Sequence, residues 1–175
     1  MTKNKKSVNN MNSQEIVDYI LNINSYKANA TVQINSNKNS NKYILKQEYN
    51  QNESIEEILE PSNIKGIKII NKEGNLIVEN SNLNLSTIFE NYQILEENYL
   101  DLSTFINECN ESNNYKYEEE NDSLIIKLKS NKDNKYIKNK ILYINKSKAI
   151  PTKLVIEDDN KKIQVNIEYN EIELN

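Results

Sequence analysis

The sequence contains no histidine, no arginine and no tryptophan, and Cys109 is its single cysteine. Without histidine there is no imidazole to act as a general base or metal ligand, and no Ser-His or Cys-His pair can form. All 22 positive side chains are lysines, so the planar group that clamps carboxylates and phosphates at two points is also missing. These absences predict a binding or scaffolding protein, with no catalytic residue, no cofactor and no metal.

Charge and apolar runs narrow the class further. The net charge is −4 and the lysines are interspersed with Asp and Glu, so there is no basic footprint for nucleic acid. No apolar stretch approaches the length that spans a membrane, and no signal-peptide core follows Met1. We expect residues 1–11 to form a polar tether and residues 12–175 to form a single domain. Membrane attachment would require a lipid anchor that precedes this sequence.

Hydrophobic periodicity predicts one helix and then a series of strands in the first half of the chain. Asn12, with Glu15 three residues later, matches a capping box, and an apolar stripe follows at helical spacing: Ile16, Tyr19, Ile20 and Ile23. Alternating apolar residues then predict strands over residues 26–34, 43–49, 55–59, 67–70 and 76–78. Pro61 ends the third of these strands, and Gly74 supplies a positive φ in the hairpin turn at 72–75.

The middle of the chain predicts helical cover, after which strands resume. A short helix or covering segment is indicated by Leu83, Leu85, Ile88, Phe89 and Tyr92. Asp101 is placed to cap a second helix with one apolar face: Leu102, Phe105, Ile106 and Cys109. Strands are then expected over residues 115–119, 124–128, 137–144, 154–157 and 163–169. In the last strand, one buried face should carry Ile163, Val165, Ile167 and Tyr169.

These segments add up to about ten strands and two or three helices. Short polar turns between neighbouring strands imply an antiparallel order, and no βαβ alternation is visible. A sheet with one apolar face needs a cover, which only the amphipathic helices can supply. The predicted fold class is therefore mainly β (α+β), with a curved antiparallel sheet, or half-barrel, wrapped on two or three helices.

The order and spacing of several stretches resemble a known family. The stretches include Tyr26–Val32, Tyr43–Tyr49, the break from Pro61 to Gly66, the Pro-x-Lys-Leu sequence at Pro151, and a final strand ending in Tyr169. Together they resemble the outer-membrane lipoprotein carriers, the LolA/LolB-like half-barrels, over about residues 13–175. No single motif is specific, but their order and spacing together are.

Within that family, the composition and length are most similar to the spore-germination lipoproteins of clostridia. This resemblance implies an extracytoplasmic, membrane-anchored lipoprotein of the developing spore. Its implied role is to bind and support a cell-wall N-acetylmuramoyl-L-alanine amidase of the CwlD type in the cortex modification needed for germination.

The alternative function is a carrier of a lipid or lipoprotein acyl group. Carriers of the family use an arginine to hold a lid over their acyl-binding cavity, and this chain has no arginine, which favours a protein-binding scaffold. An open apolar cavity of several hundred Å3 in the concave face would favour the carrier. A cavity filled by the protein's own side chains would favour the scaffold.

Candidate reactive residues are few. Cys109 is expected to be a small buried hydrophobe, because no base is present to activate it as a nucleophile. Two acidic clusters, Glu118–Glu120 with Asp122 and Asp158–Asp159, are expected on solvated turns, since the glycine-containing calcium-loop pattern is absent. A glycosidase-type carboxylate pair is recognised only by spatial separation, so sequence gives no signal for one.

Tyrosines near strand ends are the candidates for partner contact, because tyrosine joins apolar area to a polar tip. The interface candidates are Tyr43, Tyr49, Tyr115, Tyr117, Tyr136 and Tyr143, although packing across strands or at the sheet rims is the commoner role of such tyrosines. A homodimer is also expected, since an open sheet leaves two edges. The connector at residues 130–135 contains no Gly or Pro, which suits strand exchange between two copies.

Overall fold

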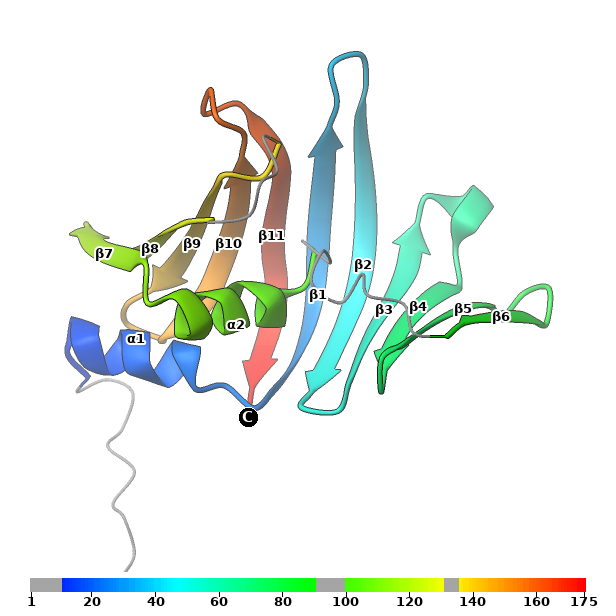
Figure 1. Cartoon of the computed structure of the whole chain (residues 1–175), viewed down its shortest axis with the longest axis horizontal. Coiled ribbons are helices and arrows are strands. Elements are labelled where there is room, and N and C mark those ends of the chain that lie inside the picture. Colours follow the sequence, from blue (N-terminus) through cyan, green and yellow to red (C-terminus); the bar gives the residue numbers. More distant parts are fainter. Residues whose placement is uncertain (1–10, 91–99, 131–135) are drawn as a thin grey trace, which may run out of the picture.

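The computed structural model describes residues 11–90, 100–130 and 136–175. Tyr92, residues 1–10 of the predicted tether and residues 131–135 of the connector lie outside these ranges. The described residues form one antiparallel sheet of eleven strands, which does not close into a barrel, and two helices (Figure 1). This arrangement confirms the predicted fold class. No helix in the described ranges is both long enough and apolar enough to cross a membrane.

The strands follow one another along the sheet, with the chain's first and last strands paired at its centre. The helices are α1 (Ser13–Leu21) and α2 (Leu102–Ser112), with a short 3-10 turn, η2 (Ser62–Ile64). The strands are β1 (Ser25–Asn35), β2 (Ser40–Asn50), β3 (Glu53–Glu60), β4 (Ile67–Lys72), β5 (Asn75–Asn80), β6 (Leu85–Phe89), β7 (Tyr115–Glu120), β8 (Ser123–Lys129), β9 (Asn139–Asn145), β10 (Ile150–Glu157) and β11 (Ile163–Leu174). Their order is β6-β5-β4-β3-β2-β1-β11-β10-β9-β8-β7, so β6 and β7 are the edges.

Local sequence signals fix the ends of several elements. The Asn12 side chain accepts a hydrogen bond from the Glu15 N–H while the Glu15 carboxylate accepts from the Asn12 N–H, which completes the predicted capping box of α1. Asp101 caps α2 as predicted. In the β4–β5 hairpin, Glu73 and Gly74 both have positive φ, at 51° and 78°. Such a pair of left-handed residues matches the twist of the two strands that it joins.

The core lies between the two helices and the face of the sheet on which they pack, here called the inner face. Figure 1 shows α1 and α2 lying across the half of the sheet that contains β7–β11 and β1. Their apolar stripes are fully buried against alternate residues of these strands, including Ile16, Ile20, Leu102, Phe105, Ala30, Val32, Ile126, Leu142, Leu154 and Ile167. Each large side chain buried in this way contributes about 1.5–3 kcal/mol. The helices therefore cover the inner face in this half of the sheet.

Two sequence predictions about β6 and β11 need correction. The segment around residues 83–92, which was expected to be a short helix or covering segment, contains strand β6. Its pairs Leu76↔Phe89 and Ile77↔Ile88 extend the sheet from β5. Apolar residues on both faces of this strand hide its period of two, which made the segment look helical. In β11, Val165, Ile167 and Tyr169 are buried as predicted, but Ile163 is exposed. Ile163 is the first residue of the strand, and the register with β10 shifts between Ile156 and Glu157, so the regular alternation of β11 does not extend to Ile163.

Candidate functional site: a polar cleft and an apolar sheet end

A buried hydrogen-bond network attaches the start of α2 to the sheet. The Tyr26 hydroxyl donates to a carboxylate oxygen of Asp101 and accepts from the Leu102 N–H at 3.2 Å. Asp101 also accepts from the Ser103 N–H at 2.9 Å. Burial, together with the negative charge of Asp101, raises the pKa of Tyr26 well above its usual value, so the hydroxyl stays protonated and remains a donor. The network thus sets the position of α2 over β1.

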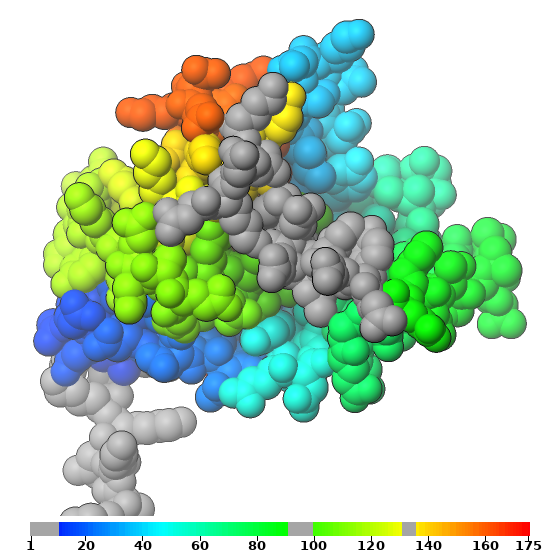
Figure 2. Space-filling view, in the orientation of Figure 1, coloured from blue at the N-terminus to red at the C-terminus, as the bar shows by residue number. Residues whose placement is uncertain are grey.

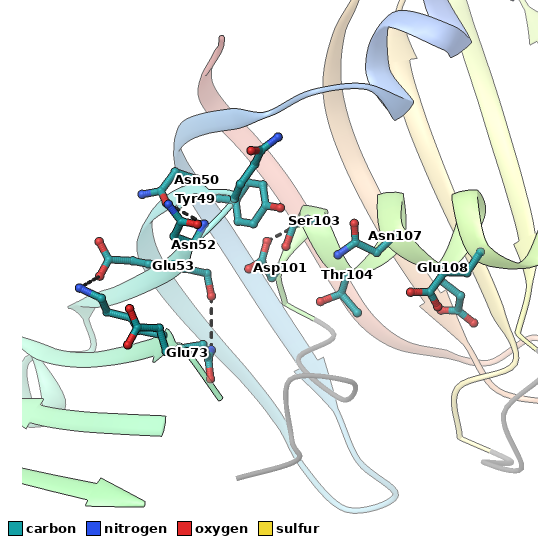
Figure 3. A pocket seen from close by; sticks show the side chains of 15 residues that line it. Tyr49, Asn50, Asn52, Glu53, Glu73, Asp101, Ser103, Thr104, Asn107 and Glu108 are labelled. Carbon is teal, nitrogen blue, oxygen red and sulfur yellow. Dashed lines mark hydrogen bonds and ion pairs between the residues drawn. The ribbon is translucent and has the colours of Figure 1, made fainter. Parts of the chain in front are cut away.

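A cleft of about 630 Å3 lies where the outer side of α2 faces two turns of the sheet (Figure 3). One bank consists of the β2–β3 and β4–β5 turns, and the other consists of α2. In Figure 3 the Tyr49 side chain points from the sheet bank toward Asp101 and Ser103. Most of the lining groups are amides and hydroxyls: Tyr49, Asn50, Gln51, Asn52, Ser54, Asn71, Ser103, Thr104 and Asn107. The cleft is therefore polar on both banks.

The charged groups of the cleft are largely paired. Glu53 lies 3.9 Å from the Lys72 ammonium, and Glu108 forms an ion pair with Lys140, which is almost fully buried. The second Glu108 oxygen, Oε1, is buried and makes no hydrogen bond to any described residue. Because Asp101 is committed to the Tyr26 network, the lining acids outside these pairings are Glu73 and Glu111, both exposed to solvent. The middle of the cleft consequently offers neutral polar groups.

The β6 side of the sheet carries a second feature, an apolar sheet end formed by Leu83, Leu85, Ile88 and Phe89 (Figure 2 shows the region in green). These four residues are between 44% and 64% exposed. Behind Ile88, the strand register places isoleucines side by side on one face: Ile77, Ile70 and Ile55. Contiguous apolar surface of this kind marks interaction sites on soluble proteins. The sequence pattern gave no indication of this surface, because the segment was interpreted as a short helix or covering segment.

The six tyrosines proposed from sequence lie in different environments and do not gather in one patch. Tyr117 and Tyr136 are exposed, whereas the other four are half-buried: Tyr43, Tyr49, Tyr115 and Tyr143. Tyr49 stacks on Tyr26 with ring centres 5.6 Å apart, and Tyr143 has the Lys153 ammonium 5.4 Å from its ring centre. Of the six, Tyr49 alone lines the cleft.

Cys109 is fully buried on the inner side of α2, as predicted. Burial raises the pKa of its thiol to about 12, with a further contribution from the Glu108 charge, so the thiol stays protonated and unreactive at neutral pH.

The acidic clusters form ion pairs and turn hydrogen bonds with neighbouring residues. Glu118–Glu120 belong to strand β7, not to a turn, where Glu118 pairs with Lys127 and Glu119 with Lys146. Asp158 lies in a turn and accepts hydrogen bonds from the N–H groups of Asn160 and Lys162. Among the described residues, no three Asp, Glu or Cys side chains gather in a geometry suited to a metal ion.

Comparison with known proteins gives one family and a set of solved folds. The model of a family described as "Sporulation protein YdcC-like" matches residues 2–175. No curated protein sequence matches the chain.

Among solved structures, the GerS lipoprotein in complex with the CwlD amidase from Clostridioides difficile aligns with a TM-score of 0.60 and 22% identity, covering 99% of each chain. An uncharacterized conserved protein from Thermus thermophilus aligns with a TM-score of 0.58 and 14% identity, covering 93% of this chain and 87% of the other. A LolA superfamily protein, NE2245 from Nitrosomonas europaea, aligns with a TM-score of 0.44 and 15% identity, covering 94% of each chain. At these identities the likeness concerns the fold alone.

Proposed function

This chain belongs to the family of YdcC-like sporulation proteins, and we propose that it is a non-catalytic, extracytoplasmic lipoprotein domain that binds and supports a cell-wall amidase. In this proposal the amidase modifies the peptidoglycan of the spore cortex, a modification that germination requires. Support for the partner comes from GerS, which shares this fold over nearly its whole length and is found in complex with the CwlD amidase.

The observation that carries this proposal is the apolar sheet end at β6. Leu85 and Phe89 lie on one face of the strand and Ile88 lies on the other, so apolar surface continues around the edge of the sheet. The Lys68–Glu57 and Lys72–Glu53 pairs join β4 to β3, where they flank the Ile70↔Ile55 pair at the far side of this apolar surface. An apolar centre with charged residues at its margin is the usual composition of a protein–protein contact. The absence of arginine from the chain leaves isoleucine, leucine and aromatic residues to anchor it.

The inner face argues against the carrier of an acyl group. An acyl chain needs an apolar cavity, but the space between the two helices and the inner face is filled by side chains such as Phe105 and Ile106. The cleft of about 630 Å3 beside α2 is lined mostly by amides and hydroxyls. An acyl chain bound there would remove water from these groups without replacing their hydrogen bonds.

A non-catalytic role fits the chemistry of the described residues. The chain has no histidine, and its one cysteine is buried with a raised thiol pKa. Such a domain would act on an amidase through contacts alone, by binding the enzyme's active state more tightly than its inactive state. Equal affinity for both states would leave the enzyme's activity unchanged.

The tyrosines remain a second proposal for the contact surface. Tyr117 and Tyr136 are the exposed members of the candidate set, and Tyr117 donates a hydrogen bond to Gln14 at 3.0 Å on the α1 side of the sheet. Because β6 and β7 are opposite edges, the two proposed surfaces are far apart in the strand order and can be tested separately.

The test is complex formation with a CwlD-type amidase on a size-exclusion column. Leu85→Ser/Ile88→Ser should abolish co-elution, whereas Tyr117→Ala/Tyr136→Ala should leave it intact. Ile163→Ser, which removes an exposed isoleucine far along the sheet, is the matched control and should also leave the complex intact. A complex that survives the β6 variant but not the tyrosine variant would move the contact to Tyr117 and Tyr136, on the side of the sheet that contains β7–β9. No complex with the unmodified chain would refute the proposed function.

A further inference from the structure

The cleft beside α2 has the properties of a ligand site that the proposed contact at β6 does not use. Its volume of about 630 Å3 falls within the range of about 300–1,000 Å3 typical of small-ligand sites. Its two banks come from segments distant in sequence, which the Tyr26–Asp101 network holds in a fixed relation. We infer that this cleft binds a neutral glycan built of N-acetylated amino sugars.

The charges of the cleft disfavour other ligand classes. An anionic ligand would meet the carboxylates of Glu53, Glu73 and Glu111, while the single lining cation, Lys72, is already paired with Glu53. A cationic ligand would find the inner acids, Glu108 and Asp101, engaged with Lys140 and Tyr26. The acids outside the pairings, Glu73 and Glu111, are exposed, so solvent screens the attraction they exert on a cation. The lining is polar, so an apolar chain would not replace its hydration. A neutral ligand rich in hydroxyls and amides is the class that remains.

The neutral lining groups suit such a ligand. Each asparagine side chain offers both donors and an acceptor, so Asn52 on the sheet bank and Asn107 on α2 can serve sugar hydroxyls and acetamido groups in either direction. Thr104 adds a hydroxyl that can also donate or accept. Tyr49 places an aromatic ring in the same cleft, and stacking on Tyr26 holds this ring in place. The apolar face of a sugar can pack against the Tyr49 ring.

The choice of N-acetylated sugars among neutral glycans rests on the proposed function, since a cell-wall amidase acts on peptidoglycan. A domain that holds the amidase at its β6 end and a glycan strand in the cleft would bring enzyme and substrate together. Two weak contacts linked in this way raise the effective concentration of substrate without any new contact in the enzyme.

The test is an NMR titration of the isotope-labelled domain with the tetramer of N-acetylglucosamine, and in parallel with the tetramer of glucosamine. The two sugars share their ring hydroxyls but differ in acetylation and positive charge. We expect saturable shifts of cleft amides with the acetylated tetramer. Asn52→Ala/Asn107→Ala should weaken binding at least about tenfold, the loss expected for two hydrogen bonds. Asn41→Ala/Asn63→Ala removes two exposed amides outside the cleft and should change nothing.

Three results would overturn the inference: no saturable shift, shifts centred outside the cleft, or binding of the glucosamine tetramer as tight as or tighter than that of the acetylated one. The last would make the cleft a cation site. Co-elution with the amidase separates this inference from the proposed function. The cleft variant should still form the complex, and a retained complex without any glycan binding would refute the glycan site alone.

Discussion

Replacing Tyr26 with phenylalanine should destabilise the protein by about 2 kcal/mol, within the range of about 1.5–3 kcal/mol for a hydrogen bond to a charged group. The substitution keeps the ring, and so keeps the stacking on Tyr49, but it removes the hydroxyl that donates to Asp101 and accepts from the Leu102 N–H. Tyr26 and Asp101 are only 1% and 3% exposed, so water cannot replace the lost bonds. The buried carboxylate would keep its bond from the Ser103 N–H.

Urea denaturation of wild type and Tyr26→Phe at pH 7 measures this loss, and thermal unfolding should show a fall in Tm of about 4–8 °C for a chain of this size. Tyr49→Phe is the matched control, because it removes the same atom from a neighbouring, half-buried ring. Amide exchange should also accelerate at Leu102 and Ser103, where α2 begins. A Tyr26→Phe variant within about 0.5 kcal/mol of wild type, the usual effect of a neutral surface change, would refute this account of how α2 is positioned.

Three further predictions follow from buried and edge groups. Burial raises the pKa of the Cys109 thiol to about 12, so its contribution to stability is complete below pH about 9 and is lost by up to about 1.4 kcal/mol per pH unit as the pH rises toward 12. Between pH 7 and 10.5, the urea midpoint should therefore fall less steeply for Cys109→Ala than for the wild type. Equal slopes for the two proteins would contradict this prediction. Lys140→Met leaves the Glu108 carboxylate buried without its cation and should lower the free energy of unfolding by about 3–5 kcal/mol. The double variant Lys140→Met/Glu108→Leu should recover most of this loss. A double variant as unstable as Lys140→Met would show that the unpaired carboxylate is not the cause. Strand β6 has no charged residue, whereas β7 carries Lys116 and Glu118–Glu120, so we expect self-association through the β6 edge. Light scattering should then show a mass that rises from that of the monomer toward that of the dimer as the protein concentration increases. A monomer mass at every concentration would refute this prediction.

Local signals in the sequence were sufficient for the caps, the hairpins and most of the strands. The capping box at Asn12, the cap at Asp101 and the turn at Gly74 each depend on residues within a few positions of one another. Strand β6 was interpreted as a short helix or covering segment because its apolar residues occupy both faces, and only its pairing with β5 reveals the strand. Hydrophobic spacing in one segment cannot report a partner strand elsewhere in the chain.

The cleft could not be predicted for a related reason. Its lining comes from residues 49–54, 71–73 and 101–111, and each segment alone is typical of ordinary polar surface. What brings them together is a contact between Tyr26 and Asp101, 75 residues apart. Among the candidate tyrosines, the sequence pattern could not separate half-buried residues such as Tyr49 from Tyr117 and Tyr136, which are exposed.

The most direct test of the central claim is the turnover of cortex peptidoglycan by a CwlD-type amidase, with and without a saturating concentration of this domain. The proposed function predicts that the domain has no turnover alone and increases that of the amidase. Leu85→Ser/Ile88→Ser should remove the increase, and Ile163→Ser should preserve it. Unchanged amidase turnover at saturation would contradict the claim that this protein supports the enzyme.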